Sequence, residues 1–155
     1  MTAWGEIETL APDFAGRVQA VFDAHKHKTM ATLRRDGLPR ISGTEVQFGM
    51  GEVWIGSMGG SMKARDLQRD PRVAIHGTTI DLELQQGDAK IAGRATEVHD
   101  EALWRAVNGD EASPPDDSHM FRIDINESVL TRVEGDELVI ESWTPGGGLR
   151  IVRRR

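Results

Sequence analysis

The chain of 155 residues contains no cysteine. It therefore has no disulfide, no thiolate nucleophile and no cysteine-ligated zinc or iron–sulfur site, which agrees with a reducing compartment. It also has no apolar run near the roughly 18 residues that a membrane span requires. Its acidic N-terminal segment, interrupted by Pro12, is unlike a signal peptide. We expect one cytoplasmic domain over residues 1–155, with no membrane partner.

Positive charge is scarce and is carried mainly by arginine. Asp and Glu number 25 against 19 Lys and Arg, so the formal net charge is -6. A general nucleic-acid binder normally carries a basic face, and this balance argues against nucleic acid as a partner. The only lysines are Lys26, Lys28, Lys63 and Lys90. One local basic pocket remains compatible with the overall charge.

Signals of side-chain catalysis are also missing. The sequence has no G-x-S-x-G nucleophile motif, and its five histidines are scattered without an H-E-x-x-H or similar metal-binding motif. Asp81 and Glu83 alternate with leucines, which predicts the solvent face of a strand for both rather than a catalytic pair of carboxylates. We therefore predict no catalytic side chain and no metal site.

Three helices can be predicted from the chain. Apolar residues recur at helical spacing in segments 12–24 and 101–108. A third, short helix is predicted between Ser61, a favourable N-cap, and Pro71, which ends it.

Most of the remaining sequence is typical of strands. Asp36-Gly37 between two β-prone runs predicts a hairpin. The polar, proline-rich segment 110–118 is predicted as a surface loop, and residues 144–155 as a C-terminal tail. Short connections leave no room for crossover helices, so about seven or eight strands predict an antiparallel barrel. The predicted strands cover residues 29–34, 40–48, 53–57, 72–77, 80–84, 89–98, the pair 121–125 and 129–133, and 138–143.

A glycine-rich loop between a predicted strand and the helix after Ser61 is the best candidate for ligand binding. Gly59 and Gly60 would let the backbone approach an anion, the first N–H groups of the helix would point outward, and Lys63 would add a full charge. These features fit a phosphate site without a Walker motif. They fit equally an ordinary strand-to-helix connection with a solvated lysine, and the spacing alone leaves both interpretations open.

Several strings resemble the pyridoxamine 5′-phosphate oxidase-like family of FMN-binding split barrels, whose superfamily includes flavin and deazaflavin oxidoreductases. The resemblance runs from about residue 25 to residue 99, and a weaker one covers 141–145. The string K-x-R-[ND]-L-x-x-D-P-R-V, here residues 63–73, is the most specific part. The other matching strings are Met30-Ala-Thr-Leu-Arg, Asp36-Gly-Leu-Pro-Arg-Ile-Ser and Val53-Trp-Ile-Gly-Ser57.

The resemblance implies a mainly β fold: a six-stranded, antiparallel, Greek-key-type split barrel with flanking helices. It implies a homodimer whose two cofactor sites lie at the subunit interface and hold FMN or the deazaflavin coenzyme F-420. The second strand would pass the ring, and the third strand with its following loop would hold the ribityl chain and phosphate. By this resemblance the cofactor site contains Arg40, Ile41, Ser42, Gly43, Thr44, Ile55, Gly56, Ser57, Met62 and Lys63, with Trp143 and Arg150 reaching it from the partner subunit. For Trp143, a buried aromatic residue at a strand end is an equal alternative.

The chemistry of these residues agrees with the resemblance at two points. The small residues 42–44 can present backbone N–H and C=O groups to a flat, polar-edged ring without an intervening side chain. An acidic protein that binds an anionic cofactor needs its positive charge in one place, which Lys63, Arg65 and Arg40 could supply.

The sequence departs from true pyridoxamine phosphate oxidases near its C-terminus. Those enzymes carry an arginine and histidine motif there, whereas residues 149–153 contain no histidine. We therefore expect not vitamin synthesis but a flavin- or deazaflavin-dependent oxidoreductase that transfers hydride to or from a small organic substrate. The alternatives are a non-catalytic protein that binds or stores FMN, deazaflavin or haem, and a dimeric scaffold that has lost its cofactor.

Overall fold

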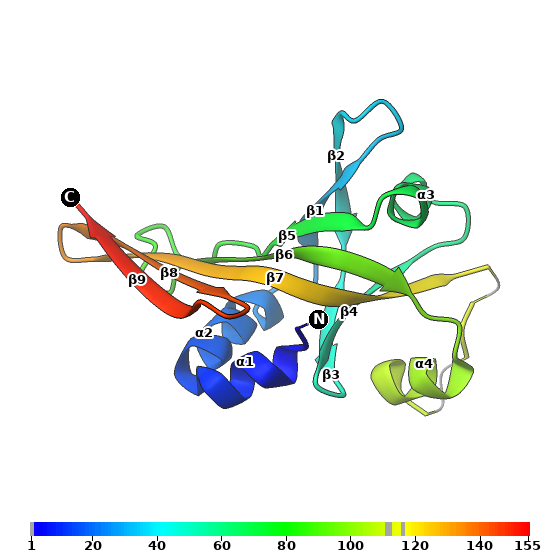
Figure 1. The fold of residues 1–155 in the computed structure, drawn as a ribbon, viewed down its shortest axis with the longest axis horizontal. Coiled ribbons are helices and arrows are strands. Elements are labelled where there is room, and N and C mark those ends of the chain that lie inside the picture. Colours follow the sequence, from blue (N-terminus) through cyan, green and yellow to red (C-terminus); the bar gives the residue numbers. More distant parts are fainter. Residues whose placement is uncertain (1, 111–112, 116) are drawn as a thin grey trace.

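The computed structural model describes residues 2–110, 113–115 and 117–155. One antiparallel sheet of nine strands dominates the fold, with four short helices around it (Figure 1). This confirms the prediction of a mainly β, antiparallel fold. The elements in chain order are α1 (Trp4–Leu10), α2 (Pro12–Asp23), β1 (Lys28–Leu33), β2 (Pro39–Thr44), β3 (Val46–Gly49), β4 (Glu52–Ser57), α3 (Met62–Arg69), β5 (Arg72–His76), β6 (Asp88–Glu97), α4 (Glu101–Asn108), β7 (His119–Glu134), β8 (Glu137–Thr144) and β9 (Gly148–Arg154).

The strands follow the order β2-β1-β5-β6-β7-β4-β3, and β8 and β9 extend the sheet from β7. The long strand β7 changes partner along its length: its first residues pair with β4 and its last with β8, while β6 lies on its other side. The predicted strand over 40–48 is two strands, because the chain leaves β1 after Thr44 and joins β4 from Val46. Glu45 therefore lies where the chain changes from one sheet partner to another.

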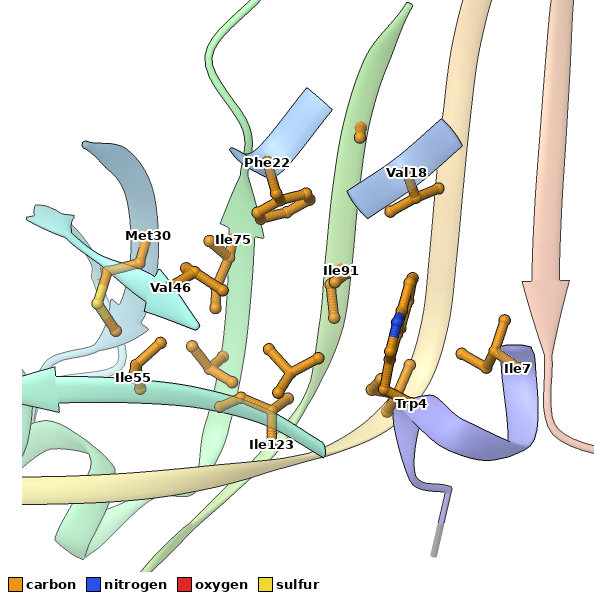
Figure 2. Packing of buried hydrophobic residues seen from close by; sticks show 14 of the residues in the cluster. Trp4, Ile7, Val18, Phe22, Met30, Val46, Ile55, Ile75, Ile91 and Ile123 are labelled. Atoms are coloured by element: carbon orange, nitrogen blue, oxygen red, sulfur yellow. The ribbon is translucent and has the colours of Figure 1, made fainter. Parts of the chain in front are cut away.

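Two N-terminal helices close one side of the sheet over the hydrophobic core. Phe14, Val18 and Phe22 of α2 are buried, which confirms the helix predicted over 12–24. The preceding helix α1 was not predicted, yet Trp4 and Ile7 are also fully buried. Figure 2 shows side chains from both helices meeting those of the strands in one cluster. Hydrophobic burial on this scale is the main stabilising contribution in a domain of this size.

The prediction of a strand over 80–84 is wrong. Residues 77–87 form a loop between β5 and β6, and Leu82 is 99% exposed. The physical reason is Asp81, whose carboxylate accepts hydrogen bonds from the backbone N–H groups of Gln85 (2.6 Å) and Gln86 (3.0 Å). Such side-chain bonds to nearby backbone compete with pairing in a sheet. Alternating leucines alone were a misleading signal here.

The C-terminal segment differs from the predicted tail. Residues 148–154 form strand β9, which pairs with β8 after a turn over 145–147; Gly146 in this turn and Gly148 at the start of β9 both have positive φ. Helix α4 has the predicted bounds. Of the predicted loop 110–118, residues 110, 113–115 and 117–118 have no helix or strand, and 111–112 and 116 lie outside the described residues. In the described part of the chain, no helix is long and apolar enough to cross a membrane.

Candidate functional site

A cleft of about 490 Å³ opens beside the last residues of β2 and β4, between α3 and α4. In Figure 1 these two helices lie on opposite sides of the first residues of β7. The cleft brings together residues that are up to about ninety positions apart in the chain, and five of the twelve predicted site residues line it. The predicted residues on its wall are Gly43, Thr44, Gly56, Ser57 and Lys63.

Lys63 lies in the first turn of α3, beside the end of β2. Ser61 caps this helix, with its Oγ accepting a hydrogen bond from the backbone N–H of Ala64 at 3.3 Å. The Lys63 ammonium donates to the Gly43 carbonyl oxygen at 2.7 Å. Burial lowers the pKa of Lys63, and Glu45 partly offsets this by favouring the charged form. A partly desolvated cation at a helix N-terminus is a favourable position for an anionic ligand.

Two glycines leave open space on the wall of the cleft. A Cβ atom built on Gly43 would meet no atom within 4 Å, and one built on Gly56 would come no closer than 3.9 Å to the His119 carbonyl oxygen. Neither residue has a positive φ, so the backbone would accept other residues there. The chain's own packing therefore does not require glycine at these positions. The open space does fit a flat group lying against the backbone.

Arg40 and Met62 do not line this cleft. The Arg40 guanidinium donates to the Asp66 carboxylate at 2.7 Å, and the same carboxylate receives hydrogen bonds from Thr32 (2.8 Å) and Arg69 (3.0 Å). Met62 lies beside them and is half exposed. Arg40 is therefore the partner of a buried aspartate, and its charge is already neutralised within the chain.

The remaining predicted residues of β2 and β4 also lie away from the cleft wall. Ile55 is 3% exposed and belongs to the hydrophobic core. Ile41 is 75% exposed, and Ser42 is half-buried on the opposite face of the same strand. Alternation along β2 thus places Ile41 and Gly43 on one exposed face.

Trp143 and Arg150 lie on β8 and β9. Trp143 is 2% exposed and packs in the core, as the alternative interpretation had it. Arg150 is exposed opposite Ser142. The neighbouring Glu141, in the weaker matching string, is buried and accepts two hydrogen bonds of 2.6 Å from Arg17 of α2. Glu141 therefore has a structural role within this chain. The contact of Trp143 and Arg150 with a partner's cofactor site stays a prediction.

The sequence interpretation missed several residues of the cleft. His119 and Trp104 line it together with the predicted residues, although His119 is 56 positions from Lys63. Nothing in the local spacing links His119 to the glycine-rich loop, because the pairing of Ser57 with His119 across β4 and β7 brings them together. Within the described ranges, no three His, Asp or Glu side chains are grouped to hold a metal ion.

A protein-family model described as Pyridoxamine 5'-phosphate oxidase matches residues 14–131. The chain belongs to this family. The match covers β1 to α3 and most of β7, so it includes every element around the cleft. Comparison with curated proteins gives no significant match.

Solved structures share the fold of this pyridoxamine 5′-phosphate oxidase family member. A pyridoxamine 5′-phosphate oxidase-related, FMN-binding protein from Nostoc punctiforme is 13% identical, over 94% of this chain and 96% of that chain, with a TM-score of 0.66. PhzG from Burkholderia lata, in complex with tetrahydrophenazine-1-carboxylic acid, is 13% identical, over 100% and 97%, with a TM-score of 0.67. HutZ, described as a haem storage protein from Vibrio cholerae, is 21% identical, over 76% and 90%, with a TM-score of 0.58. At these identities the likeness concerns the fold, which confirms the predicted split barrel.

Proposed function

We propose that this protein is an oxidoreductase that binds FMN or the deazaflavin coenzyme F-420 in the cleft and transfers hydride to or from a small organic substrate. The observation that carries the proposal is Lys63, held against Gly43 at the start of α3, on the wall of a cleft with open space at Gly43 and Gly56. Similar structures include one described as FMN-binding.

The chain's own residues would bind and orient such a cofactor. Lys63 and the first N–H groups of α3 would hold the phosphate, because both favour an anion. The backbone around Gly43 and Gly56 would lie against the flat part of the molecule. The cofactor supplies the hydride chemistry when bound, so the cleft needs no nucleophile of its own.

We further propose that two copies of the chain complete the site. Ile41 shares the exposed face of β2 with Gly43, and a second copy that covers Ile41 would border the cleft. Leu149 and Ile151 on β9 are 40% and 53% exposed, which adds apolar surface for such contacts. Alternation along β9 turns Arg150 to the face opposite Leu149 and Ile151, so the reach of Arg150 into a partner's site is a separate proposal.

The test is titration of the purified protein with FMN and with coenzyme F-420, followed by absorbance and fluorescence. Lys63→Ala should weaken binding of the preferred cofactor by about 10- to 100-fold, the usual effect of losing a hydrogen bond to a charged group. Lys90→Ala is the matched control, because Lys90 lies exposed on β6 away from the cleft. Unchanged affinity in Lys63→Ala would contradict the placement of the phosphate.

A carrier without catalytic activity is the second candidate, since one similar structure is described as a haem storage protein. Turnover separates the two functions. The reduced cofactor bound to an enzyme should be reoxidised repeatedly by an added acceptor, whereas a carrier should protect it. Binding of neither FMN nor F-420 near micromolar concentrations would reject the oxidoreductase.

A further inference from the structure

His119 lines the cleft and pairs with Glu97 behind it, and the proposed cofactor contacts leave this pair unused. His119 begins β7 and Glu97 ends the neighbouring β6. The His119 Nδ1 atom lies 2.5 Å from the Glu97 Oε1 atom, and the two side chains are 20% and 15% exposed. The pair is therefore close, largely shielded from solvent and adjacent to the space where a ligand would lie.

Both side chains are held in place by further contacts. The second carboxylate oxygen of Glu97 accepts a hydrogen bond from Gln68 Nε2 of α3 at 2.8 Å. The His119 ring stacks on Phe121, with ring centroids 6.2 Å apart. Three elements, β6, β7 and α3, thus fix the orientation of the imidazole. Packing and hydrogen bonds of this kind hold a reactive group in a single geometry.

The pairing decides which histidine nitrogen is available. Burial raises the pKa of Glu97, but hydrogen bonds from His119 and Gln68 outweigh this and hold it below its usual value. Glu97 is then an ionised acceptor for Nδ1–H, so the neutral ring carries its proton on Nδ1 and the doubly protonated ring carries its second proton on Nε2. The Nε2 atom has no hydrogen-bond partner in residues 2–110, 113–115 and 117–155.

Among the described residues, the other charged or titratable groups nearest the pair are His99, Asp117 and those on the remaining walls of the cleft. His99 lies 3.9 Å from the second oxygen of Glu97 and is 79% exposed. Lys63, Glu45 and His27 lie on other walls of the cleft. Glu97 is the group that orients the imidazole, because it makes the direct hydrogen bond.

We propose that His119 is an acid–base catalytic residue of the cleft and that Glu97 is its positioning residue. The substrate would be a compound that gains a proton as well as a hydride, such as a conjugated carbonyl compound, whose oxygen would accept a hydrogen bond from Nε2–H of the doubly protonated ring. Trp104, half-exposed on the same cleft, offers an aromatic surface for a flat molecule. This inference rests on the proposed function.

For a quinone as the acceptor, the bound reduced cofactor would supply a hydride, that is, both electrons and one hydrogen, and would itself be oxidised. The second hydrogen would be the Nε2 proton of the doubly protonated His119 ring, which would move to a carbonyl oxygen and complete the hydroquinone. The imidazole is left neutral and takes a proton from water. General acid catalysis of this kind contributes typically about 10²- to 10⁴-fold in rate.

The first test needs no cofactor. Long-range ¹⁵N–¹H NMR of the histidine rings should show the His119 ring protonated at Nδ1 when neutral, and Glu97→Gln should raise the share of the Nε2–H tautomer. A neutral His119 found mainly as the Nε2–H tautomer in the unmodified protein would overturn the proposal. This result is independent of whether FMN or F-420 binds.

The second test compares two electron acceptors with the cofactor-loaded protein. Reduction of menadione, which requires a proton, should fall about 100-fold or more in His119→Gln. Where the bound cofactor is FMN, reduction of ferricyanide, a one-electron acceptor that needs no proton, should stay within about threefold; with either cofactor, affinity should also stay within about threefold. His76→Gln is the matched control, because His76 lies 4.0 Å from Asp88 outside the cleft.

The outcomes distinguish the two proposals. Failure of the unmodified protein to bind FMN or F-420 rejects the proposed function. Normal cofactor binding with unchanged menadione reduction in His119→Gln rejects the acid–base role alone. Glu97→Gln should lower menadione reduction and shift its pH profile, which serves as the test if His119→Gln does not fold. A haem absorbance band that depends on His119 would make this residue an iron ligand and would also overturn the acid–base role.

Discussion

At the scale of single residues, the cleft depends on two positions where no side chain projects. Gly43 and Gly56 have neither positive φ nor close neighbours that would exclude a Cβ atom. Glycine in a strand has a cost in stability, because it loses more conformational freedom on folding and packs no side chain. Gly49 meets the same two criteria away from the cleft, so it is the position of Gly43 and Gly56 on the cleft wall that makes a ligand beside them our proposal.

Gly56→Val tests this explanation. The free energy of unfolding should be unchanged or higher by up to about 1 kcal/mol, since valine suits a strand better than glycine. Cofactor affinity should fall by at least tenfold, because the branched side chain would fill part of the cleft. Urea unfolding and cofactor titration measure the two effects. Gly49→Val on β3 is the control, since it also has space for a side chain but does not line the cleft.

At the scale of elements, a buried carboxylate fixes the position of α3. Asp66 is 1% exposed and accepts hydrogen bonds from Thr32 of β1, Arg40 of β2 and Arg69 of its own helix. These bonds join the helix that carries Lys63 to the strand that carries Gly43. The most specific string of the sequence therefore contains both a candidate ligand contact and the residue that positions it.

Asp66→Asn should destabilise the protein by roughly 3 kcal/mol at neutral pH, because it leaves Arg40 and Arg69 without their charged partner. Burial raises the pKa of Asp66, but the bonds from Arg40, Thr32 and Arg69 outweigh it and lower the pKa overall. The stability that depends on this carboxylate is thus present above about pH 4 and is lost as the pH falls through the lowered value.

Urea unfolding between pH 2 and pH 7 measures this contribution. The unmodified protein should lose more stability below pH 4 than Asp66→Asn does, since the variant has no carboxylate to protonate at this position. Asp70→Asn is the control, because Asp70 pairs with Arg72 on the surface and should change stability much less. Equal free energies of unfolding for Asp66→Asn and Asp70→Asn at pH 7 would contradict the role assigned to Asp66.

At the scale of the whole molecule, the local positive charge and the exposed apolar surface lie near the same cleft. The net charge of -6 does not prevent binding of an anionic cofactor, because the helix N-terminus and Lys63 make one part of the surface favourable to anions. Ile41 stands exposed on the same face of β2 as the cleft. A second copy covering this face would shield the cleft from water.

We propose that the unmodified protein is a dimer. Ile41→Glu should then give a folded monomer that binds the cofactor more weakly. A charge placed in an apolar contact between subunits is costly because it is desolvated without a partner. Sedimentation velocity and cofactor titration measure the two effects. Leu82→Glu is the control, since Leu82 is 99% exposed on the loop between β5 and β6, and it should leave the dimer intact. A monomeric unmodified protein would reject the dimer.

Much of the local structure could be predicted from the sequence. The helices at 12–23 and 101–108 follow from apolar spacing, and the Asp36-Gly37 hairpin from turn chemistry. The wrongly predicted strand and the missed helix also have local causes. The strand over 80–84 was inferred from alternation, which does not reveal the side-chain bonds of Asp81 to the backbone. Helix α1 is only seven residues long, too short for its buried face to give a clear period.

The sequence by itself determined the periodicity of the elements, the capped start of α3 and the string that marks the family, because these depend on neighbours along the chain. Only the tertiary structure decided which residues share the cleft. It placed Lys63 against Gly43, paired Arg40 with Asp66, buried Trp143 and brought His119 to Glu97. Alternation assigns a residue to a face of a strand, but sheet pairing between distant segments decides what that face meets.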